Sequence, residues 1–74
     1  MNKLKVGDTI SAILFGGKRV QGKVEHIEIC NKDNPKYGRS VEQCDLREHT
    51  YGTIDLDTGN WCYFNQIKCI VKQE

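Results

Sequence analysis

Residues 52–64, with the sequence GTIDLDTGNWCYF, decide the fold. Apolar and polar side chains alternate on both sides of a short segment rich in Asp, Gly and Asn. This pattern is typical of two antiparallel strands joined by a tight turn. Residues 65–66 then interrupt the alternation and predict a single turn of 3-10 helix. Residues 67–71 are again apolar enough to predict a last strand.

The geometry of the turn within this stretch decides where Trp61 and Tyr63 point. A type I turn followed by a left-handed Gly59 would pair Leu56 with Asn60 and turn both aromatic rings away from the core. A two-residue type II′ turn would shift the register by one residue and place both rings in the core. Tryptophan is on average mostly buried, which favours the second alternative. The first alternative remains open, and it would turn the two rings into a binding platform.

The first half of the chain predicts a hairpin with a long second strand. Residues 9–15 are β-branched and apolar, and residues 16–17 are two glycines that can take the positive φ angles of a tight turn. Residues 18–29 form the expected return strand, but their apolar side chains change face partway along it. Such a change of phase needs a bulge or a sharp bend, and Gly22 is the natural place for bending or close backbone approach.

The middle of the chain predicts a long loop over about residues 31–51. Residues 31–39 carry Asn-Pro and Gly turn signals. Residues 40–49 leave two alternatives open. Ser40 and Gln43 have the spacing of a capping box for a short helix, whereas the alternation of apolar residues favours an edge strand. We favour the strand.

Composition indicates one small β domain over residues 1–74. A chain of 74 residues has room for a single core. The polar N-terminal residues do not resemble a signal peptide, and no apolar run approaches the ~18 residues of a membrane helix. We therefore expect no membrane association.

Positive and negative side chains are nearly equal in number but unevenly distributed along the chain. Eleven Lys and Arg oppose ten Asp and Glu, which gives a formal net charge of +1 and no strong whole-molecule field. Residues 1–39 hold eight basic and four acidic side chains, whereas residues 40–74 hold three and six. The two halves either neutralise each other or leave a basic edge able to meet phosphate.

The four cysteines predict neither a metal site nor a disulfide framework. Cys30, Cys44, Cys62 and Cys69 are separated by 13, 17 and 6 residues, with no Cys-x-x-Cys pair to hold a tetrahedral ion. Small buried thiols in a reducing compartment explain them, so we expect a cytoplasmic protein without a cofactor.

Three segments together resemble the small Src-homology-3-like or Tudor-like β-barrels. In that group a Val-Gly-Asp entry, a Gly-x-Val second strand and an Asp-x-Gly-x-Trp hairpin recur, and the matching segments here are residues 6–10, 22–27 and 54–67. The resemblance covers roughly residues 6–30 and 52–72. It implies an all-β fold of five or six strands closed into a small barrel. Between residues 31 and 51 the long loop departs from the pattern.

No constellation for catalysis is evident, and we expect no enzyme. Ser40, His49 and Asp45 could be written as a triad, but no strained nucleophile turn accompanies them. The two glycines of the first hairpin lack the following helix and Lys-Ser/Thr pair of a phosphate loop. Barrels of the resembling group serve many binding roles, so the resemblance alone does not select a ligand.

Two binding functions remain. The first is a protein-interaction adaptor that uses an exposed sheet edge or an aromatic groove around Trp61 and Tyr63. The second is a phosphate-directed binder of nucleic acid or a small nucleotide, for example a bacterial or viral accessory protein that sequesters its ligand. Its candidate ligand-binding residues are cations and an aromatic ring in the loop: Lys32, Lys36, Tyr37 and Arg39. We rank the adaptor first, and we expect short sheet edges to allow a homodimer or higher homo-oligomer.

Overall fold

The computed structural model describes residues 3–30, 38–47 and 51–73 and shows an all-β protein. These residues form no α-helix, only two short 3-10 turns, η1 (Phe15–Gly17) and η2 (Phe64–Gln66). The strands are β1 (Lys3–Lys5), β2 (Thr9–Ile13), β3 (Arg19–Cys30), β4 (Gly38–Val41), β5 (Gln43–Asp45), β6 (Gly52–Leu56), β7 (Trp61–Tyr63) and β8 (Ile67–Lys72). The predicted hairpins, the 3-10 turn after residue 63 and the last strand are all confirmed.

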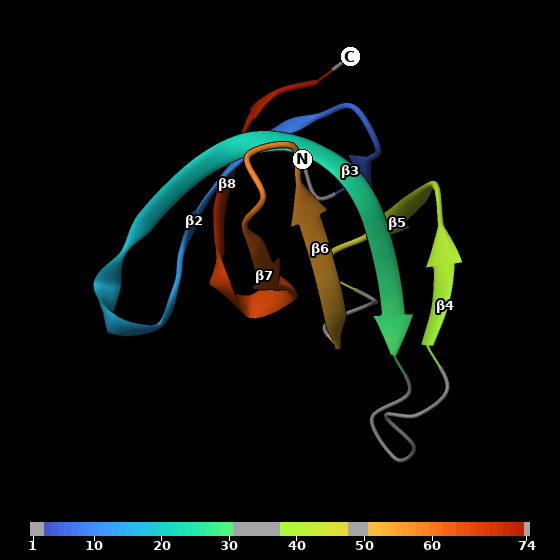
Figure 1. The fold of residues 1–74 in the computed structure, drawn as a ribbon. Helices are drawn as coiled ribbons and strands as arrows, with labels where there is room; N and C mark the ends of the chain where they lie inside the picture. Colours follow the sequence, from blue (N-terminus) through green and yellow to red (C-terminus); the bar gives the residue numbers. More distant parts are fainter. Residues whose placement is uncertain (1–2, 31–37, 48–50, 74) are drawn as a thin grey trace.

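β3 organises the molecule by belonging to two sheet regions at once. Its first part pairs with β2, which in turn pairs with β8. Its second part pairs with β6 and with β4, and β6 pairs with β7. All of these pairs are antiparallel, and Figure 1 shows β3 arching over the other strands. A separate two-stranded sheet joins β1 to β5.

The pairing of the described strands does not close these sheets into a barrel. β7 has three residues, and η2 separates it from β8, so the path of hydrogen-bonded strands ends at β7 on one side and at β8 on the other. The predicted all-β class is therefore confirmed, whereas the closed barrel is not what these strands form.

The bend in β3 follows from its sequence. Val20, Gly22 and Val24 face the core, and the register against β6 then shifts between Val24 and His26. This bulge brings Ile27 back to the core, where it is fully buried. Gly22 is the point of close approach: a Cβ atom there would lie 3.0 Å from Oδ1 of Asp57. The sequence predicted a bend or close backbone approach at Gly22. The close approach is at Gly22, whereas the bulge lies between Val24 and His26.

The expected loop over residues 31–51 is wrong for residues 38–45, and its residues 31–37 and 48–50 lie outside the described residues. Residues 38–45 form β4 and β5, so the strand alternative for this segment is the correct one and the helix alternative is wrong. Cys44 is buried against Leu4 of β1, its partner in the register. The pair of β1 and β5 thereby adds Leu4 and Cys44 to the core. The sequence did not predict that β1 would be the partner strand of β5.

A single apolar cluster joins the two sheet regions. Ile10 of β2, Val24 and Ile27 of β3 and Ile54 of β6 are its buried centre, and none exceeds 1% exposure. Asp8 is also fully buried. Its carboxylate accepts a hydrogen bond from the Lys5 backbone N–H (2.9 Å) within the turn that leads into β2, which offsets part of the cost of burying it. No helix of the described residues is long and apolar enough to cross a membrane.

Candidate functional site: an exposed aromatic groove

The β6–β7 hairpin adopts the turn that exposes its aromatic residues. The backbone N–H of Leu56 donates to the carbonyl of Asn60 (2.9 Å), and Gly59 has a φ of 89°. Asp55 is then paired with Trp61, as a type I turn followed by a left-handed glycine requires. The alternative that we favoured from the sequence, with both rings in the core, is wrong.

Trp61 and Tyr63 stand on the outer face of the sheet. Their exposed fractions are 50% and 39%, whereas Cys62 and Phe64 between and after them are buried. The error arose from applying the average burial of tryptophan to one turn. The left-handed glycine at position 59, which the sequence does show, is the stronger signal.

Phe15 extends the aromatic surface from the turn between β2 and β3. It lies in η1, where Gly16 and Gly17 have φ angles of 81° and 83° and the Leu14 N–H donates to the Lys18 carbonyl (2.8 Å). This turn holds the Phe15 side chain in the open, with 81% of its surface exposed. The apolar pattern of residues 9–15 predicted a strand that includes Phe15, and this prediction is wrong for Phe15. An aromatic residue directly before two turn glycines is a usable signal for an exposed ring.

The three rings form a continuous edge-to-face series. The ring centroids of Trp61 and Tyr63 lie 5.1 Å apart at an interplanar angle of 86°. Those of Phe15 and Tyr63 lie 6.0 Å apart at 69°. Edge-to-face pairs contribute about 0.5–1.5 kcal/mol each beyond burial, so the rings hold one another in place although they are exposed.

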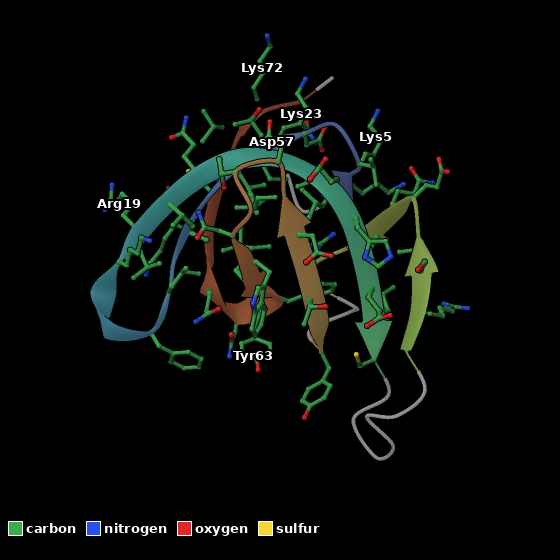
Figure 2. All side chains as sticks on the ribbon, viewed as in Figure 1. Lys5, Arg19, Lys23, Asp57, Tyr63 and Lys72 are labelled. Atoms are coloured by element: carbon green, nitrogen blue, oxygen red, sulfur yellow. The ribbon has the colours of Figure 1, made fainter. Side chains whose placement is uncertain are left out.

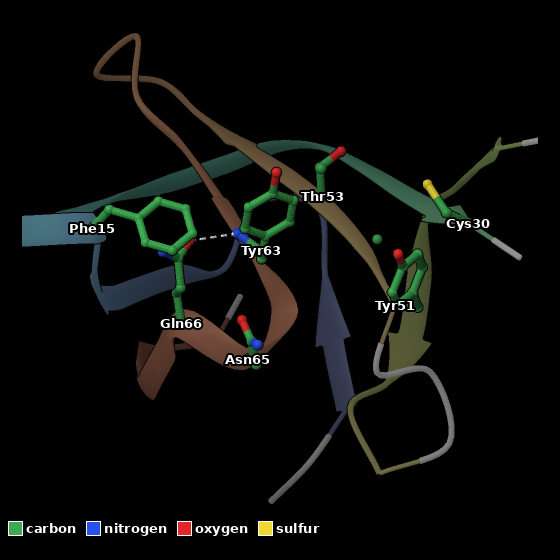
Figure 3. A pocket seen from close by; sticks show the side chains of 8 residues that line it. Phe15, Cys30, Tyr51, Thr53, Tyr63, Asn65 and Gln66 are labelled. Carbon is green, nitrogen blue, oxygen red and sulfur yellow. Dashed lines mark hydrogen bonds between the residues drawn. The ribbon is translucent and has the colours of Figure 1, made fainter. Parts of the chain in front are cut away.

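Two hollows flank this series. The larger, of about 610 Å³, lies between Phe15 and Tyr63 on one side and Tyr51 and Cys30 on the other, with Thr53, Asn65 and Gln66 lining it (Figure 3). The second, of about 310 Å³, lies between Phe15, Tyr63 and Trp61. We call the two hollows and their rings the aromatic groove. Its size falls within the range of small-ligand and side-chain pockets, roughly 300–1,000 Å³.

The polar end of the groove is fixed by η2. Oε1 of Gln66 accepts a hydrogen bond from the backbone N–H of Tyr63 (2.8 Å), drawn as a dashed line in Figure 3. Gln66 lines both hollows. This hydrogen bond therefore links the backbone of Tyr63 to a side chain that the two hollows share. The groove therefore has an apolar floor and a few amide groups at one end, as specific ligand sites do.

The four cysteines are free and differ in environment. Cys44 and Cys62 are buried, Cys30 is half-buried beside the larger hollow, and Cys69 is exposed. Burial, with a smaller contribution from Asp55, raises the pKa of the Cys62 thiol to about 11. Burial and then Asp45 also raise the pKa of Cys44. Neither buried thiol is an activated nucleophile, since activation requires a lowered pKa.

A second polar cluster, which sequence analysis missed, crosses three strands. Nε2 of His26 lies 2.6 Å from Oγ of Ser40, and Nδ1 of His26 lies 3.3 Å from Oδ2 of Asp55. The order of groups matches a Ser–His–Asp relay, with different residues from the triad considered above. The cluster serves as a polar tie between β4, β3 and β6.

The phosphate-directed residues fall only partly within the described structure. Lys32, Lys36 and Tyr37 lie outside the described residues. Arg39 is exposed on β4, in register with Ile29. Arg39 does not line either hollow of the aromatic groove. The described part of the chain therefore does not bring Arg39 together with Trp61 and Tyr63.

Comparison with known proteins adds no assignment. No family model, no curated protein and no solved structure matches the chain.

Proposed function

We propose that the protein is a non-enzymatic binding module that holds a short extended peptide of a partner protein in its aromatic groove. The observation that carries this proposal is the row of exposed rings, Phe15, Tyr63 and Trp61, with a hollow on either side of Tyr63. The exposed rings contact one another edge to face, and aromatic anchors dominate the energetics of protein interfaces.

The shape of the groove favours an extended chain over a compact ligand. Two hollows separated by one ring suit alternate side chains of a peptide, and aromatic-lined grooves of this kind accept polyproline II segments, whose low entropy reduces the cost of binding. Docking of a peptide strand on a sheet edge near the groove is less well supported, because β7 offers only three residues and β4 only four. The longer edge strand β8 has six residues but does not carry the exposed rings.

Two further parts of the sequence-based expectation belong to this proposal. The succession β2, β3, β6, β7, η2 and β8 keeps the order of elements expected for an Src-homology-3-like domain, and we propose that the fold is an incompletely closed member of that group. Four free thiols suit the reducing cytoplasm.

Selection from a phage-displayed library of random twelve-residue peptides tests the proposal. We expect enrichment of proline-rich or apolar peptides, and the single tryptophan of the chain, Trp61, reports their binding by fluorescence. Phe15→Ala and Tyr63→Ala should each weaken a selected peptide at least tenfold, because each removes a ring that lines both hollows.

Val71→Ala is the matched control. Val71 is an apolar side chain with 48% exposure on β8, outside the groove, so its truncation should leave affinity within about twofold. Raised salt should also have little effect. The proposal is wrong if no peptide is enriched, or if selected peptides bind the Phe15→Ala and Tyr63→Ala proteins as well as the original one.

A further inference from the structure

The near-zero net charge conceals a separation of charge between the two sheet regions. The strands β2 and β8 and the first part of β3 with its turn, residues 9–13, 18–23 and 67–73, contain five Lys and Arg and no Asp or Glu: Lys18, Arg19, Lys23, Lys68 and Lys72. We call this set the basic sheet. The other sheet region with its turns, residues 24–30, 38–42 and 52–63, contains one Arg and five acidic residues: Glu25, Glu28, Glu42, Asp55 and Asp57.

The register gathers three of the five basic side chains on the outer face of the basic sheet. Thr9 is paired with Lys23 on one side and with Lys72 on the other, so these two lysines flank it, roughly 10 Å apart across two strand spacings. Arg19 lies four residues before Lys23 on the same face of β3, at roughly 13 Å along the strand. All three side chains are exposed, and Figure 2 shows them projecting outward from the arch of β3 and its neighbours.

The ground between these cations is not aromatic. Thr9, Ser11 and Gln21 share the outer face with Ile13 and Cys69, and residues 9–13, 18–23 and 67–73 include no aromatic side chain. Hydroxyl and amide groups beside Lys and Arg are the groups that contact phosphate and sugar, whereas reading or stacking of bases needs aromatic or groove-reading elements. The face therefore suits a phosphate backbone and not the bases.

We propose that the basic sheet binds the backbone of single-stranded nucleic acid without sequence preference. β3 makes this face convex (Figure 1), and a flexible single strand can follow a convex surface that a stiff duplex touches only at one point. This binding is separate from the peptide groove, because Trp61 and Tyr63 lie on β7 in the other sheet region and Phe15 lies in η1, where its ring packs against Tyr63. Asp57 borders the basic sheet, where its Oδ1 accepts the Lys23 backbone N–H (3.0 Å), and limits the face at that end.

Fluorescence anisotropy with a fluorescein-labelled 20-nucleotide oligo(dT) tests the proposal on the full chain. Each phosphate contact contributes about −0.7 to the slope of log K against log salt for single strands, so three to five contacts predict a slope between about −2 and −3.5. The double variant Arg19→Gln/Lys72→Gln should flatten the slope by about 1.4 and weaken binding at least tenfold at 50 mM salt.

Lys3→Gln/Arg47→Gln is the matched control, because it removes the same charge from exposed positions outside the basic sheet, on and beside the sheet of β1 and β5. It should leave both the slope and the affinity close to those of the unmodified protein. Circular dichroism confirms that both double variants fold. A control variant that loses as much binding as Arg19→Gln/Lys72→Gln would move the site to the sheet of β1 and β5 and overturn the proposal.

Three further outcomes also contradict it. These are no binding at 50 mM salt, a 20-base-pair duplex that binds more tightly than oligo(dT), and a poly-glutamate chain of equal length that binds as tightly. The last outcome would assign the face to acidic proteins. Tyr63→Ala should bind oligo(dT) normally, so failure of this proposal and failure of the peptide groove are distinguishable.

Discussion

At the scale of single residues, burial of a side chain determines its properties more than its residue type does. Cys62 and Trp61 are neighbours on β7, yet the sulfur is fully buried and the indole is half exposed. The thiol fills space beside Ile54, its partner in the register. Its raised pKa is a consequence of that burial, and it couples the stability of the fold to alkaline pH.

Stability should fall above pH 9 because of Cys62. The pKa of this thiol is 9.0 in the unfolded chain and about 11 in the folded protein, so its contribution is complete below pH 9 and is lost as the pH rises toward 11. At pH 10.5 the loss amounts to about 2 kcal/mol relative to pH 8. Urea denaturation at both pH values measures it. Cys62→Ala is less stable at pH 8 but should show a drop smaller by that amount, and equal drops in the two proteins would contradict the assignment.

At the scale of elements, the sequence specified the strands and turns better than the faces they present. The apolar periodicity, the two glycines at 16–17 and the Asp-Thr-Gly turn are local signals, and each produced its element. The direction of Trp61 depends on a one-residue choice of register, which local propensity does not decide. Phe15 and Tyr51 joined the site only because η1 and β6 are brought together by the long strand β3.

β4 and β5 show the same limit from another side. The segment of residues 38–45 is short and mostly polar. It forms strands because it pairs with β3 and with β1, which is distant in the sequence. Strand propensity is set largely by such partners. The polar tie from Ser40 through His26 to Asp55 was invisible for the same reason, since it needs three strands in register.

The β6–β7 hairpin should depend on a left-handed residue at position 59. Nothing lies within 4 Å of a Cβ atom built on Gly59, so the φ of 89° alone makes a side chain costly there. Gly59→Ala should destabilise the protein by about 1–2 kcal/mol, whereas Gly59→Asn should cost less, because Asn tolerates this conformation. Urea denaturation compares them. Equal stability of the Ala variant and the unmodified protein would mean that the turn has another form.

At the scale of the whole molecule, two sheet regions with opposite charge share one core and one strand. Each region alone has too little apolar surface to offset the entropy of ordering its residues, because small cores are marginal. The shared residues Val24 and Ile27 lie on β3 where the regions meet. The aromatic groove and the basic sheet are therefore two surfaces of one cooperative unit.

This architecture predicts a single unfolding transition that either region can shift. Ile10 of β2 and Ile54 of β6 are both fully buried, and Ile→Val at each should cost about 1 kcal/mol. Trp61 lies on β7, so its fluorescence reports the region that contains Ile54. If β3 couples the regions, Ile10→Val lowers the urea midpoint seen by Trp61 as much as Ile54→Val does, and circular dichroism gives the same midpoint. If the regions unfold separately, Ile10→Val leaves the Trp61 midpoint unchanged while the circular dichroism signal splits into two transitions.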